Sequence, residues 1–489
     1  MHRTIPSLFR RAVERAPSDT WLYYEDHTWT FEHALARIER AASGLRTLGV
    51  APGDRVLMPA RNDADHLLSW LALMEVGAVQ VPINPASTDD EVAGFVHQVR
   101  PHLILDSAEV AALFDHEPDG RGPADRQPDD LAVMIPTSGT TGRSKLVMQT
   151  HLAYVMGGEG FPWWMQLDAE DRLMTSLPLF HVNAPVYSVL GSVAVGAGLV
   201  LLPGFSASTF LDSARRYGAT EFNAIGAMLE ILMRQPERPD DADTPLRLCY
   251  TGPSPPKERH LEIEARFGLR IVCGYGLSES PYALIWRHGE RPYGTLGSLR
   301  QHPELGEVNE GRVVDETGRV VAPGEVGELE LRNPTIMRGY FEMPAETSEV
   351  LVDGWLRTGD LVTEDGDGTY TFVSRKKEVI RRRGENLSPA EVEAAIDAHP
   401  AVAESAVIGV PDELTEEEVK AFVVLASGAE LDVEGLVEHL RSRLSRFKIP
   451  RYLEVVDDLP HTPTGRLAKH RLPTGRTPDE IDLTETEPR

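Results

Sequence analysis

The chain has 489 residues, of which 41% are hydrophobic and 26% are charged, and its formal net charge is −27. These values are typical of an acidic globular protein with two or three domains. The charge argues against a nucleic-acid partner, because nucleic-acid recognition depends on basic surface.

The first 300 residues predict helices that alternate with strands. Thr30 is a suitable cap for a helix that Gly49 ends. Apolar strand-like and helix-like segments then follow one another at 54–59, 66–77 and 78–84. This alternation indicates parallel sheets with helices packed on them, an α/β fold. The same rhythm continues at 199–204, 209–218 and 221–225.

A long uncharged run includes Val182 to Phe210. A membrane span is one interpretation of such a run. Its glycines and prolines favour the other, a buried helix followed by a strand. The N-terminus has no apolar core of signal-peptide length. We therefore expect no membrane span and a cytoplasmic protein.

The pattern changes near residue 295. Residues 311–332 predict short strands with glycine-containing turns, which is typical of a small β-barrel-like unit. A compact α+β segment follows at 374–402, so we expect domains at 1–375 and 376–489. The polar tail 473–489 predicts a frayed end.

The two cysteines, Cys249 and Cys273, are too few for a disulfide framework or a zinc site, which fits a reducing compartment. Either thiol could act as a nucleophile. We expect both to be buried packing residues instead, because an unpaired cysteine behaves as a small hydrophobe.

Residues 135–147, IPTSGTTGRSKLV, carry the strongest chemical signal. An apolar strand leads into glycines, hydroxyl residues and Lys145, which together can wrap phosphate oxygens. The segment is not a Walker A loop, because Lys145 stands three residues after Gly142. A flexible surface loop is the alternative interpretation.

TSGTTGRSK closely resembles the phosphate loop of the adenylate-forming superfamily, which includes acyl-CoA ligases, luciferases and the adenylation domains of peptide synthetases. Other blocks resemble this superfamily in the same order along nearly the whole chain, and the pattern is most similar to that of acyl-CoA ligases. The blocks are LPLFHVN (177–183), GYGLSES (274–280), GELELRNPTIMRGYF (327–341), GWLRTGD (354–360), SRKKEVIRRRGENLSPAEVE (374–393) and PTGRLAK (463–469).

The resemblance implies a two-step reaction. A carboxylate first attacks the α-phosphate of ATP, which gives an acyl-adenylate and pyrophosphate. The thiolate of coenzyme A then displaces AMP to give a thioester. It further implies a large N-terminal acyl- and adenylate-binding domain at 1–375. The small C-terminal domain at 376–489 would be a mobile lid that rotates at a hinge near Lys377.

The resemblance also assigns nucleotide-binding residues. Glu279 would hold Mg²⁺, a hard cation that takes one or two carboxylates together with phosphate oxygens. Asp360 would bind the ribose hydroxyls with help from Arg375, and Tyr275 would stack on adenine. Ser278 would touch the α-phosphate. The other residues implied for ATP or acyl-AMP are Thr137, Ser138, Gly139, Thr140, Thr141, Gly142, Lys145, Gly252, Pro253 and Ser254.

The same resemblance implies residues that bind coenzyme A and the acid. Gly384 would line the pantetheine tunnel. Arg381 and its two neighbouring arginines either meet the CoA phosphates or form a solvated basic patch. His181 has a gating or a packing role at the acyl pocket. The other implied pocket residues are Asn183, Ala184, Phe222, Gly226 and Gly274. Many of them are small, so we expect a bulky acid, larger than acetate.

The sequence departs from the family pattern at three positions. Ser144 replaces the usual proline and Leu146 the usual glycine after the phosphate loop, so Leu146 is expected to add bulk where the backbone would stay close to pyrophosphate. Arg466 occupies the position of the lysine that catalyses adenylation. Arginine keeps the charge, but its planar fork is larger and aims differently. We expect weak or absent adenylation with thioester formation intact. Lys469 could substitute for the missing lysine by a register shift.

Other functions stay open at this point. A complete ATP-dependent ligase that tolerates Arg466 is the main alternative, and a separate adenylating enzyme would be a partner only if adenylation is lost. An enzyme that loads a carrier protein, a luciferase-type oxygenase and a non-catalytic binder of acyl-adenylates are further alternatives.

Overall fold

The structure is a computed structural model that describes residues 3–137, 145–252, 254–382, 385–412, 416–461, 467–477 and 479–483. Contacts divide the chain into two compact units. Unit 1 comprises Met1–Gly311, Leu331–Arg357 and Gly368–Tyr370, and unit 2 comprises Arg312–Glu330, Thr358–Asp367 and Thr371–Arg489. The domain boundary near Lys377 stays a prediction.

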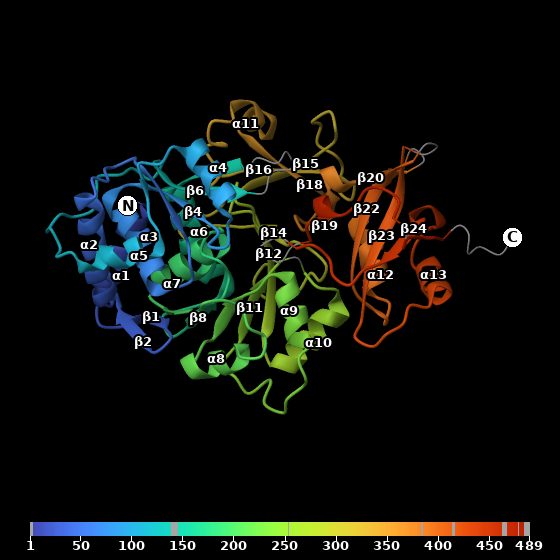
Figure 1. The fold of residues 1–489 in the computed structure, drawn as a ribbon, viewed down its shortest axis with the longest axis horizontal. Helices are drawn as coiled ribbons and strands as arrows, with labels where there is room; N and C mark the ends of the chain where they lie inside the picture. Colours follow the sequence, from blue (N-terminus) through green and yellow to red (C-terminus); the bar gives the residue numbers. More distant parts are fainter. Residues whose placement is uncertain are drawn as a thin grey trace. The chain divides into compact units, whose positions relative to one another are not determined.

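Unit 1 contains a nine-stranded sheet in the order β14-β13-β12-β11-β10-β8-β9-β1-β2 (Figure 1). The strands from β12 to β1 run parallel to their neighbours, and the outer strands pair antiparallel. The strands are β1 (Thr20–Tyr24), β2 (His27–Thr30), β8 (Arg172–Thr175), β9 (Gly198–Leu201), β10 (Glu221–Asn223), β11 (Leu248–Thr251), β12 (Arg270–Tyr275), β13 (Leu284–Ile285) and β14 (Ser298–Leu299).

A second sheet of unit 1 has the order β5-β3-β4-β6-β7, in which β7 alone pairs antiparallel. Its strands are β3 (Arg55–Pro59), β4 (Val79–Ile83), β5 (Leu103–Ile104), β6 (Leu131–Thr137) and β7 (Lys145–Thr150). The two sheets confirm the predicted α/β layers.

The helices of unit 1 lie between these strands in the chain. They are α1 (Ile5–Arg15), α2 (Phe31–Thr47), α3 (Ala64–Val76), α4 (Asp89–Val99), α5 (Ser107–Ala112), the 3₁₀ helix η1 (Leu113–Asp115), α6 (His151–Met165), the π-helix η2 (Ala184–Val189), α7 (Leu190–Val195), α8 (Phe210–Tyr217), α9 (Gly226–Met233), α10 (Lys257–Phe267) and α11 (Pro344–Val350). Thr30 caps α2, since its side chain accepts a hydrogen bond from the backbone N of His33, as predicted.

Most residues of a third sheet belong to unit 2. Its order is β15-β16-β18-β17, and β19 pairs with β18. Its strands are β15 (Glu310–Val314), β16 (Gly327–Arg332), β17 (Leu351–Val352), β18 (Trp355–Glu364) and β19 (Tyr370–Arg375). This sheet is the predicted small β-unit.

The rest of unit 2 is an α+β fold. Its sheet has the order β21-β20-β23-β24-β25, and β22 pairs with β23. Its elements are η3 (Lys376–Glu378), β20 (Ile380–Arg382), β21 (Glu385–Leu387), α12 (Pro389–Asp397), β22 (Val402–Asp412), β23 (Glu416–Leu425), α13 (Val433–Arg441), η4 (Arg446–Lys448), β24 (Tyr452–Val455), η5 (Lys469–Arg471) and β25 (Ile481–Asp482).

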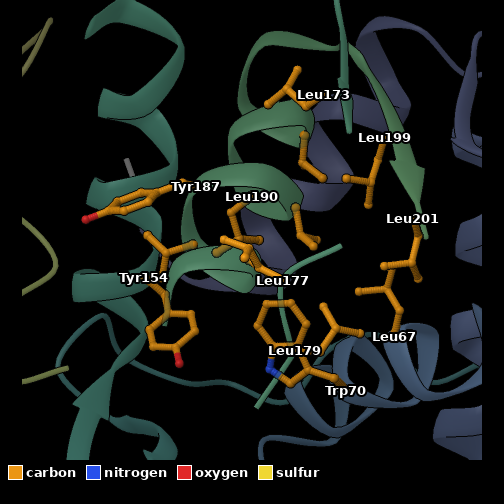
Figure 2. Packing of buried hydrophobic residues seen from close by; sticks show 14 of the residues in the cluster. Leu67, Trp70, Tyr154, Leu173, Leu177, Leu179, Tyr187, Leu190, Leu199 and Leu201 are labelled. Carbon is orange, nitrogen blue, oxygen red and sulfur yellow. The ribbon is translucent and has the colours of Figure 1, made fainter. Parts of the chain in front are cut away.

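The uncharged run from Val182 to Phe210 folds as expected, into buried helical turns followed by a strand. It forms η2 and α7 and then β9. Figure 2 shows Leu199 and Leu201 of β9 pointing toward the buried side chains around Leu190. Among the described residues, no helix combines the length and apolar character that a membrane crossing needs.

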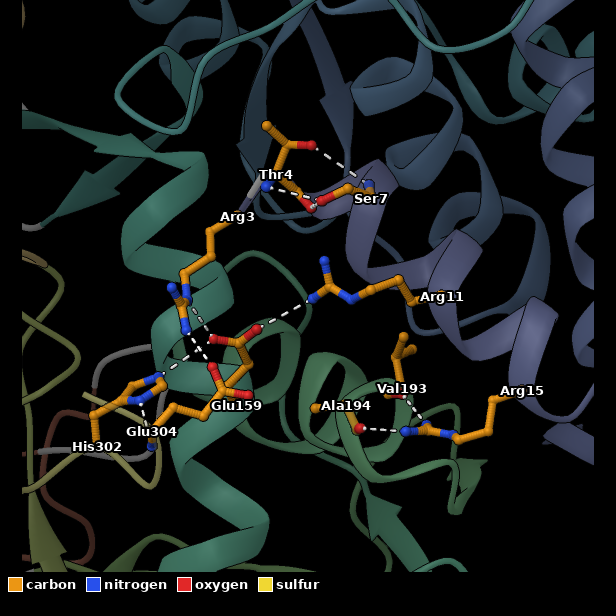
Figure 3. Close-up of polar contacts among 10 residues, drawn as sticks. All are labelled: Arg3, Thr4, Ser7, Arg11, Arg15, Glu159, Val193, Ala194, His302 and Glu304. Carbon is orange, nitrogen blue, oxygen red and sulfur yellow. Dashed lines mark hydrogen bonds and ion pairs between the residues drawn. The ribbon is translucent and has the colours of Figure 1, made fainter. Parts of the chain in front are cut away.

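A partly buried acid connects the N-terminal segment of unit 1 to α6 (Figure 3). Glu159 of α6 accepts from Arg3 Nε at 2.8 Å, pairs with Arg11 at 3.2 Å and contacts His302 Nε2 at 3.3 Å. Burial alone would raise the pKa of Glu159, but the hydrogen bonds from His302 and Arg3 hold that pKa below its usual value. The carboxylate therefore joins α1, α6 and the chain near residue 302.

The predicted fraying of the tail from residue 473 is wrong for the part that the structure describes. β25 pairs with β24, and Glu480 has a fully buried side chain. The cause is Lys420 of β23, whose buried ammonium lies 2.8 Å from Glu480 Oε2. A buried cation requires a nearby anion, and the tail supplies one. Residues 484–489 lie outside the described residues.

Candidate functional site

The predicted phosphate loop joins the two strands of an antiparallel hairpin. Thr137 ends β6, Lys145 begins β7, and these two residues are paired. The Thr137 hydroxyl donates to the backbone O of Lys145 at 3.3 Å. Residues 138–144 of the loop, which hold Ser138, Gly139, Thr140, Thr141 and Gly142, lie outside the described residues.

Lys145 and Glu279, the predicted magnesium ligand, both contact Tyr340. The Nζ atom of Lys145 lies 4.4 Å from the centre of the Tyr340 ring. The Tyr340 hydroxyl donates to Glu279 Oε1 at 2.9 Å. Sequence reasoning missed Tyr340, although the block 327–341 that contains it had been singled out. A side chain's contact with a residue 61 positions away leaves no signal in a single sequence.

The backbone places these three residues together. Residues 338–341 lie along β7, where Tyr340 bridges Val147 and the backbone N of Arg338 donates to Met148 O. The backbone of Met337 donates to Glu279 O at 2.8 Å. Ser278, next to Glu279, accepts from Gln149 Nε2 of β7 at 2.6 Å through its backbone O. β7 thus aligns the segments that carry Glu279 and Tyr340.

Leu146 does not project toward a ligand, contrary to the expectation that its bulk would interfere with pyrophosphate. Its side chain is fully buried in a cluster with Leu57, Val81 and Met134. Side chains alternate across a strand, so the residue after Lys145 points to the opposite face. Ser144, the other departure here, lies outside the described residues.

The carboxyl ends of β11 and β12 approach each other closely. A Cβ atom on Gly252 would come within 2.3 Å of the backbone O of Gly274, so no other residue fits there. Tyr275 is half-buried at the end of β12. The Ser254 hydroxyl accepts from the backbone N of Gly294 at 3.2 Å. Pro253 lies outside the described residues. These neighbours share the edge where open α/β sheets bind ligands.

The predicted acyl pocket contains a pair of amides. Asn223 Nδ2 donates to Asn183 Oδ1 at 2.7 Å, and Asn223 is almost completely buried. Phe222 points the other way, since its ring packs on Phe210 of α8 at 5.0 Å. The His181 ring lies 4.5 Å from that of Phe180. Asn223 therefore contacts the predicted pocket residue Asn183, whereas Phe222 packs into the core.

Three of the residues predicted for the acyl pocket are small. Ala184 is buried at the start of η2, and Gly226 begins α9. A Cβ atom on Gly274 would meet the Tyr250 ring at 2.8 Å and Arg300 Nη2 at 3.0 Å. The absence of a side chain at Gly274 accommodates Tyr250 and Arg300. It does not by itself indicate an open pocket.

Both cysteines are buried, as predicted. Burial raises the pKa of the Cys273 thiol to about 12 and raises that of Cys249 as well. The thiolate is the nucleophilic form, so neither group is suited to attack a substrate near neutral pH.

Unit 2 holds the predicted ribose-binding pair. Arg375 Nε lies 2.8 Å from Asp360 Oδ1, and the Asp360 side chain is fully buried. The backbone N of Asp360 donates to Thr358 Oγ1 at 3.1 Å. Lys376 pairs with Glu328 at 2.8 Å. For Lys377, the predicted hinge, the structure describes the backbone of η3 but not the side chain.

The basic cluster near Gly384 does not act as one surface. Arg382 is buried, where it pairs with Glu418 at 2.6 Å and donates to Ile449 O. Its guanidinium therefore does not face solvent. The Arg381 side chain and all of Gly384 lie outside the described part. The CoA contacts of Arg381 and Gly384 stay predictions.

The loop that carries Arg466 has a closed base. His461 and Leu467 form an isolated antiparallel bridge on either side of residues 462–466, which lie outside the described residues. Lys469 Nζ lies 2.7 Å from Glu393 Oε1 and 3.3 Å from Glu378 Oε2. These ion pairs inside unit 2 argue against Lys469 replacing the lysine that Arg466 displaces.

The donor set around Glu279 fits magnesium better than a tightly chelated metal. Among the described residues, no three or more His, Cys, Asp and Glu side chains gather as a metal site. Magnesium is commonly bound by one or two carboxylates, with substrate phosphates and water completing the shell. Glu279, with Lys145 as the predicted phosphate-binding lysine on the same tyrosine, meets that requirement.

Two family models match the chain. The model described as AMP-binding enzyme matches residues 9–341, and the model described as AMP-binding enzyme C-terminal domain matches residues 391–466. The chain belongs to the AMP-binding enzyme family. The predicted superfamily is thereby confirmed, with Lys145, Glu279 and Asn223 inside the first match and Arg466 at the end of the second.

Several proteins that are similar to this AMP-binding enzyme are named as CoA ligases or CoA synthetases. The crotonobetaine/carnitine–CoA ligase of Salmonella arizonae is 32% identical over 89% of this chain and 91% of the relative. ATP-bound MatB from Rhodopseudomonas palustris is 29% identical, with a TM-score of 0.86 over 96% of this chain and 98% of that one. The o-succinylbenzoate CoA synthetase of Bacillus subtilis, in complex with its acyl-adenylate intermediate, is 27% identical, with a TM-score of 0.86 over the same shares. The predicted fold and the predicted enzyme class, an AMP-forming acyl-CoA ligase, are confirmed.

Proposed function

We propose that this AMP-binding enzyme makes the CoA thioester of a carboxylic acid from an acyl-adenylate, and that Arg466 makes its adenylate-forming half-reaction slow. The observation that carries the nucleotide-binding part is the fully buried Asp360 carboxylate held by Arg375. A carboxylate accepts two hydrogen bonds well, which suits the paired hydroxyls of a ribose.

In the first half-reaction, a carboxylate oxygen of the acid would attack the α-phosphorus of ATP, and pyrophosphate would leave. Lys145 would hold phosphate oxygens, and Glu279 would hold Mg²⁺, which neutralises phosphate charge when bound. Ser278 would contact the α-phosphate. Arginine at position 466 keeps a positive charge but places it differently from lysine, at a cost of about 3 kcal/mol in the transition state.

In the second half-reaction, the CoA thiolate would attack the acyl carbon, and AMP would leave with the electron pair of the broken C–O bond. This step needs no phosphorus chemistry, so the change at Arg466 need not slow it. Gly384 and Arg381 would contact CoA. Rotation of the C-terminal domain about Lys377 would separate the two half-reactions.

The acid is proposed to be larger than acetate. Ala184 leaves room at the start of η2, and the Asn183–Asn223 amide pair offers polar contacts. His181 would gate or pack this region. Synthetic acetyl-AMP and benzoyl-AMP, each supplied with CoA, test the size. A faster reaction with acetyl-AMP would refute the preference for a bulky acid.

An experiment that separates the two halves tests the main proposal. One reaction contains acid, ATP and Mg²⁺ and follows pyrophosphate exchange, and the other contains acyl-AMP and CoA and follows the thioester. Arg466→Lys should raise exchange about a hundredfold and leave thioester formation unchanged. The exposed Arg471 provides the matched control, since Arg471→Lys should change neither rate.

Each other outcome selects a different function. Rapid exchange by the natural protein identifies a complete ATP-dependent ligase. Slow exchange with rapid thioester formation supports the proposal and requires a separate adenylating enzyme. Transfer only to a carrier protein identifies a carrier-loading enzyme, and an O₂-dependent product identifies an oxygenase. Tight acyl-AMP binding without turnover identifies a non-catalytic binder.

A further inference from the structure

Tyr340 occupies a position between two opposite charges of unit 1. Lys145 Nζ lies over the face of its ring at 4.4 Å, and its hydroxyl reaches Glu279 Oε1 at 2.9 Å. Tyr340 therefore contacts the Lys145 cation with its ring and the Glu279 carboxylate with its hydroxyl.

The tyrosine is held firmly enough to do this. Only 7% of its surface is exposed. Its backbone N donates to Thr347 Oγ1 at 2.9 Å, and it bridges Val147 of β7. Gly339 before it has a φ of 127°, and a Cβ atom there would meet Thr347 Cγ2 at 2.7 Å. These contacts hold the backbone that carries the Tyr340 ring in one position.

The hydroxyl of Tyr340 is a donor. Its oxygen lies 2.9 Å from Glu279 Oε1, and the phenol supplies the proton of this bond because a carboxylate is an acceptor. Glu279 accepts this hydrogen bond through Oε1, so its Oε2 is available for a cation. A carboxylate oriented in this way is typical of magnesium and zinc sites, where outer hydrogen bonds set the ligand's direction.

We propose that Tyr340 is a positioning residue that aims Glu279 at Mg²⁺ with its hydroxyl and keeps Lys145 available for nucleotide phosphates with its ring. This inference rests on the proposed roles of Glu279 and Lys145. It separates two functions of one side chain, so two substitutions can distinguish them. Tyr340→Phe keeps the ring and removes the hydroxyl, whereas Tyr340→Leu removes both.

Titration calorimetry with ATP, once with Mg²⁺ and once with EDTA, tests the inference without turnover, because neither acid nor CoA is present. In Tyr340→Phe the gain in ATP affinity caused by Mg²⁺ should fall by about tenfold or more, and affinity in EDTA should stay unchanged. In Tyr340→Leu the affinity in EDTA should fall as well, since Lys145 loses the ring beneath it.

Tyr217 provides the control. Its hydroxyl donates to Glu25 O at 2.9 Å on another part of unit 1, so Tyr217→Phe should leave both titrations unchanged. Equal losses with Mg²⁺ and EDTA in Tyr340→Phe, with a lower melting temperature, would show a merely structural role and overturn the inference. A natural protein whose ATP affinity does not depend on Mg²⁺ would overturn it too. Failure of the proposed function appears separately, as absent thioester in the reaction with acyl-AMP and CoA.

Discussion

Arg375 Nε lies 2.8 Å from the buried Oδ1 of Asp360, and this pair stands where β18 and β19 come together in unit 2. The Asp360 side chain has no exposed surface, whereas 40% of the Arg375 side chain is exposed. A buried carboxylate requires a positive partner, and a half-exposed arginine does not require a negative one. Arg375 therefore compensates the charge of a carboxylate that is completely buried.

We expect Asp360→Asn to weaken AMP binding by about ten- to a hundredfold, the loss typical of a hydrogen bond to a charged group. The substitution keeps the volume, so unit 2 should stay folded. Calorimetric titration with AMP measures the change. Asp365, exposed between β18 and β19, supplies the control Asp365→Asn, which should bind AMP as the natural protein does. Equal affinities of the two variants would contradict the role of Asp360.

A second prediction concerns Leu146, which replaces the glycine usual in the family. Because its side chain is fully buried with Leu57, Val81 and Met134, Leu146→Ala should lower the free energy of unfolding by about 2–5 kcal/mol. Leu146→Gly should lower it by about 1 kcal/mol more, since glycine weakens a strand. Urea denaturation measures both.

Leu305, which is 47% exposed, provides the matched control for that experiment. Leu305→Ala should change the free energy of unfolding by less than about 0.5 kcal/mol. A stable Leu146→Gly variant with faster pyrophosphate exchange would show that the family glycine matters for catalysis at this position, against the packing that we describe.

These two cases show what could be predicted from the sequence. The order of helices and strands followed from apolar periodicity, and Thr30 capped its helix as expected. The Asp360–Arg375 pair followed from family resemblance. The face of a short strand from which a side chain projects could not be predicted, because a shift of one residue exchanges the two faces. That is why Leu146 and Phe222 were expected at ligands, while both pack into the core.

Contacts between residues that lie far apart in the sequence could not be predicted either. The hydroxyl of Tyr340 and the carboxylate of Glu279 come together only because 338–341 lies along β7. The tail was expected to be frayed because its composition is polar. Composition could not indicate that a lysine in the interior of β23 needs an acid from that tail.

The third prediction addresses that lysine. Lys420 is fully buried and lies 2.8 Å from both Glu454 Oε2 and Glu480 Oε2. Lys420→Met removes the cation that the two carboxylates share and, among the described residues, leaves Glu480 with Arg476 alone, so we expect a loss of about 3–5 kcal/mol in the stability of unit 2 at neutral pH. Protection of β23 and β24 amides against hydrogen exchange measures it.

The same variant has a predictable dependence on pH. Burial would raise the pKa of Glu454, but hydrogen bonds from Lys420 and Thr477 bring that pKa below its usual value. A depressed native pKa stabilises the fold above the unfolded value of 4.5, and the gain is lost as the pH falls through the native pKa. The difference between Lys420→Met and the natural protein should therefore shrink in acid. Lys448→Met, at a surface pair with Glu391, is the control and should cost no more than about 1 kcal/mol.

The last prediction concerns Asp397 at the end of α12. Desolvation, together with the charges of Glu393 and Glu404, raises its pKa to about 7 against the opposing hydrogen bonds from Ser405. A carboxyl with a raised native pKa favours the fold only while it is protonated. Its contribution is complete below the unfolded value near 3.8 and is lost as the pH rises through 7.

Asp397→Asn removes this dependence because an amide has no charge to desolvate. Relative to the natural protein, the variant should stabilise unit 2 by about 1 kcal/mol at pH 8, because solvent screens the exposed Asp397 carboxylate. The advantage should diminish steadily toward pH 4. Exchange rates of α12 amides across this range measure it, after correction for the intrinsic effect of pH. The exposed Asp432, which caps α13, offers a contrast, since Asp432→Asn keeps a capping oxygen and should produce a nearly constant difference across the same range. A constant difference for Asp397→Asn as well would mean that Asp397 does not titrate near neutral pH.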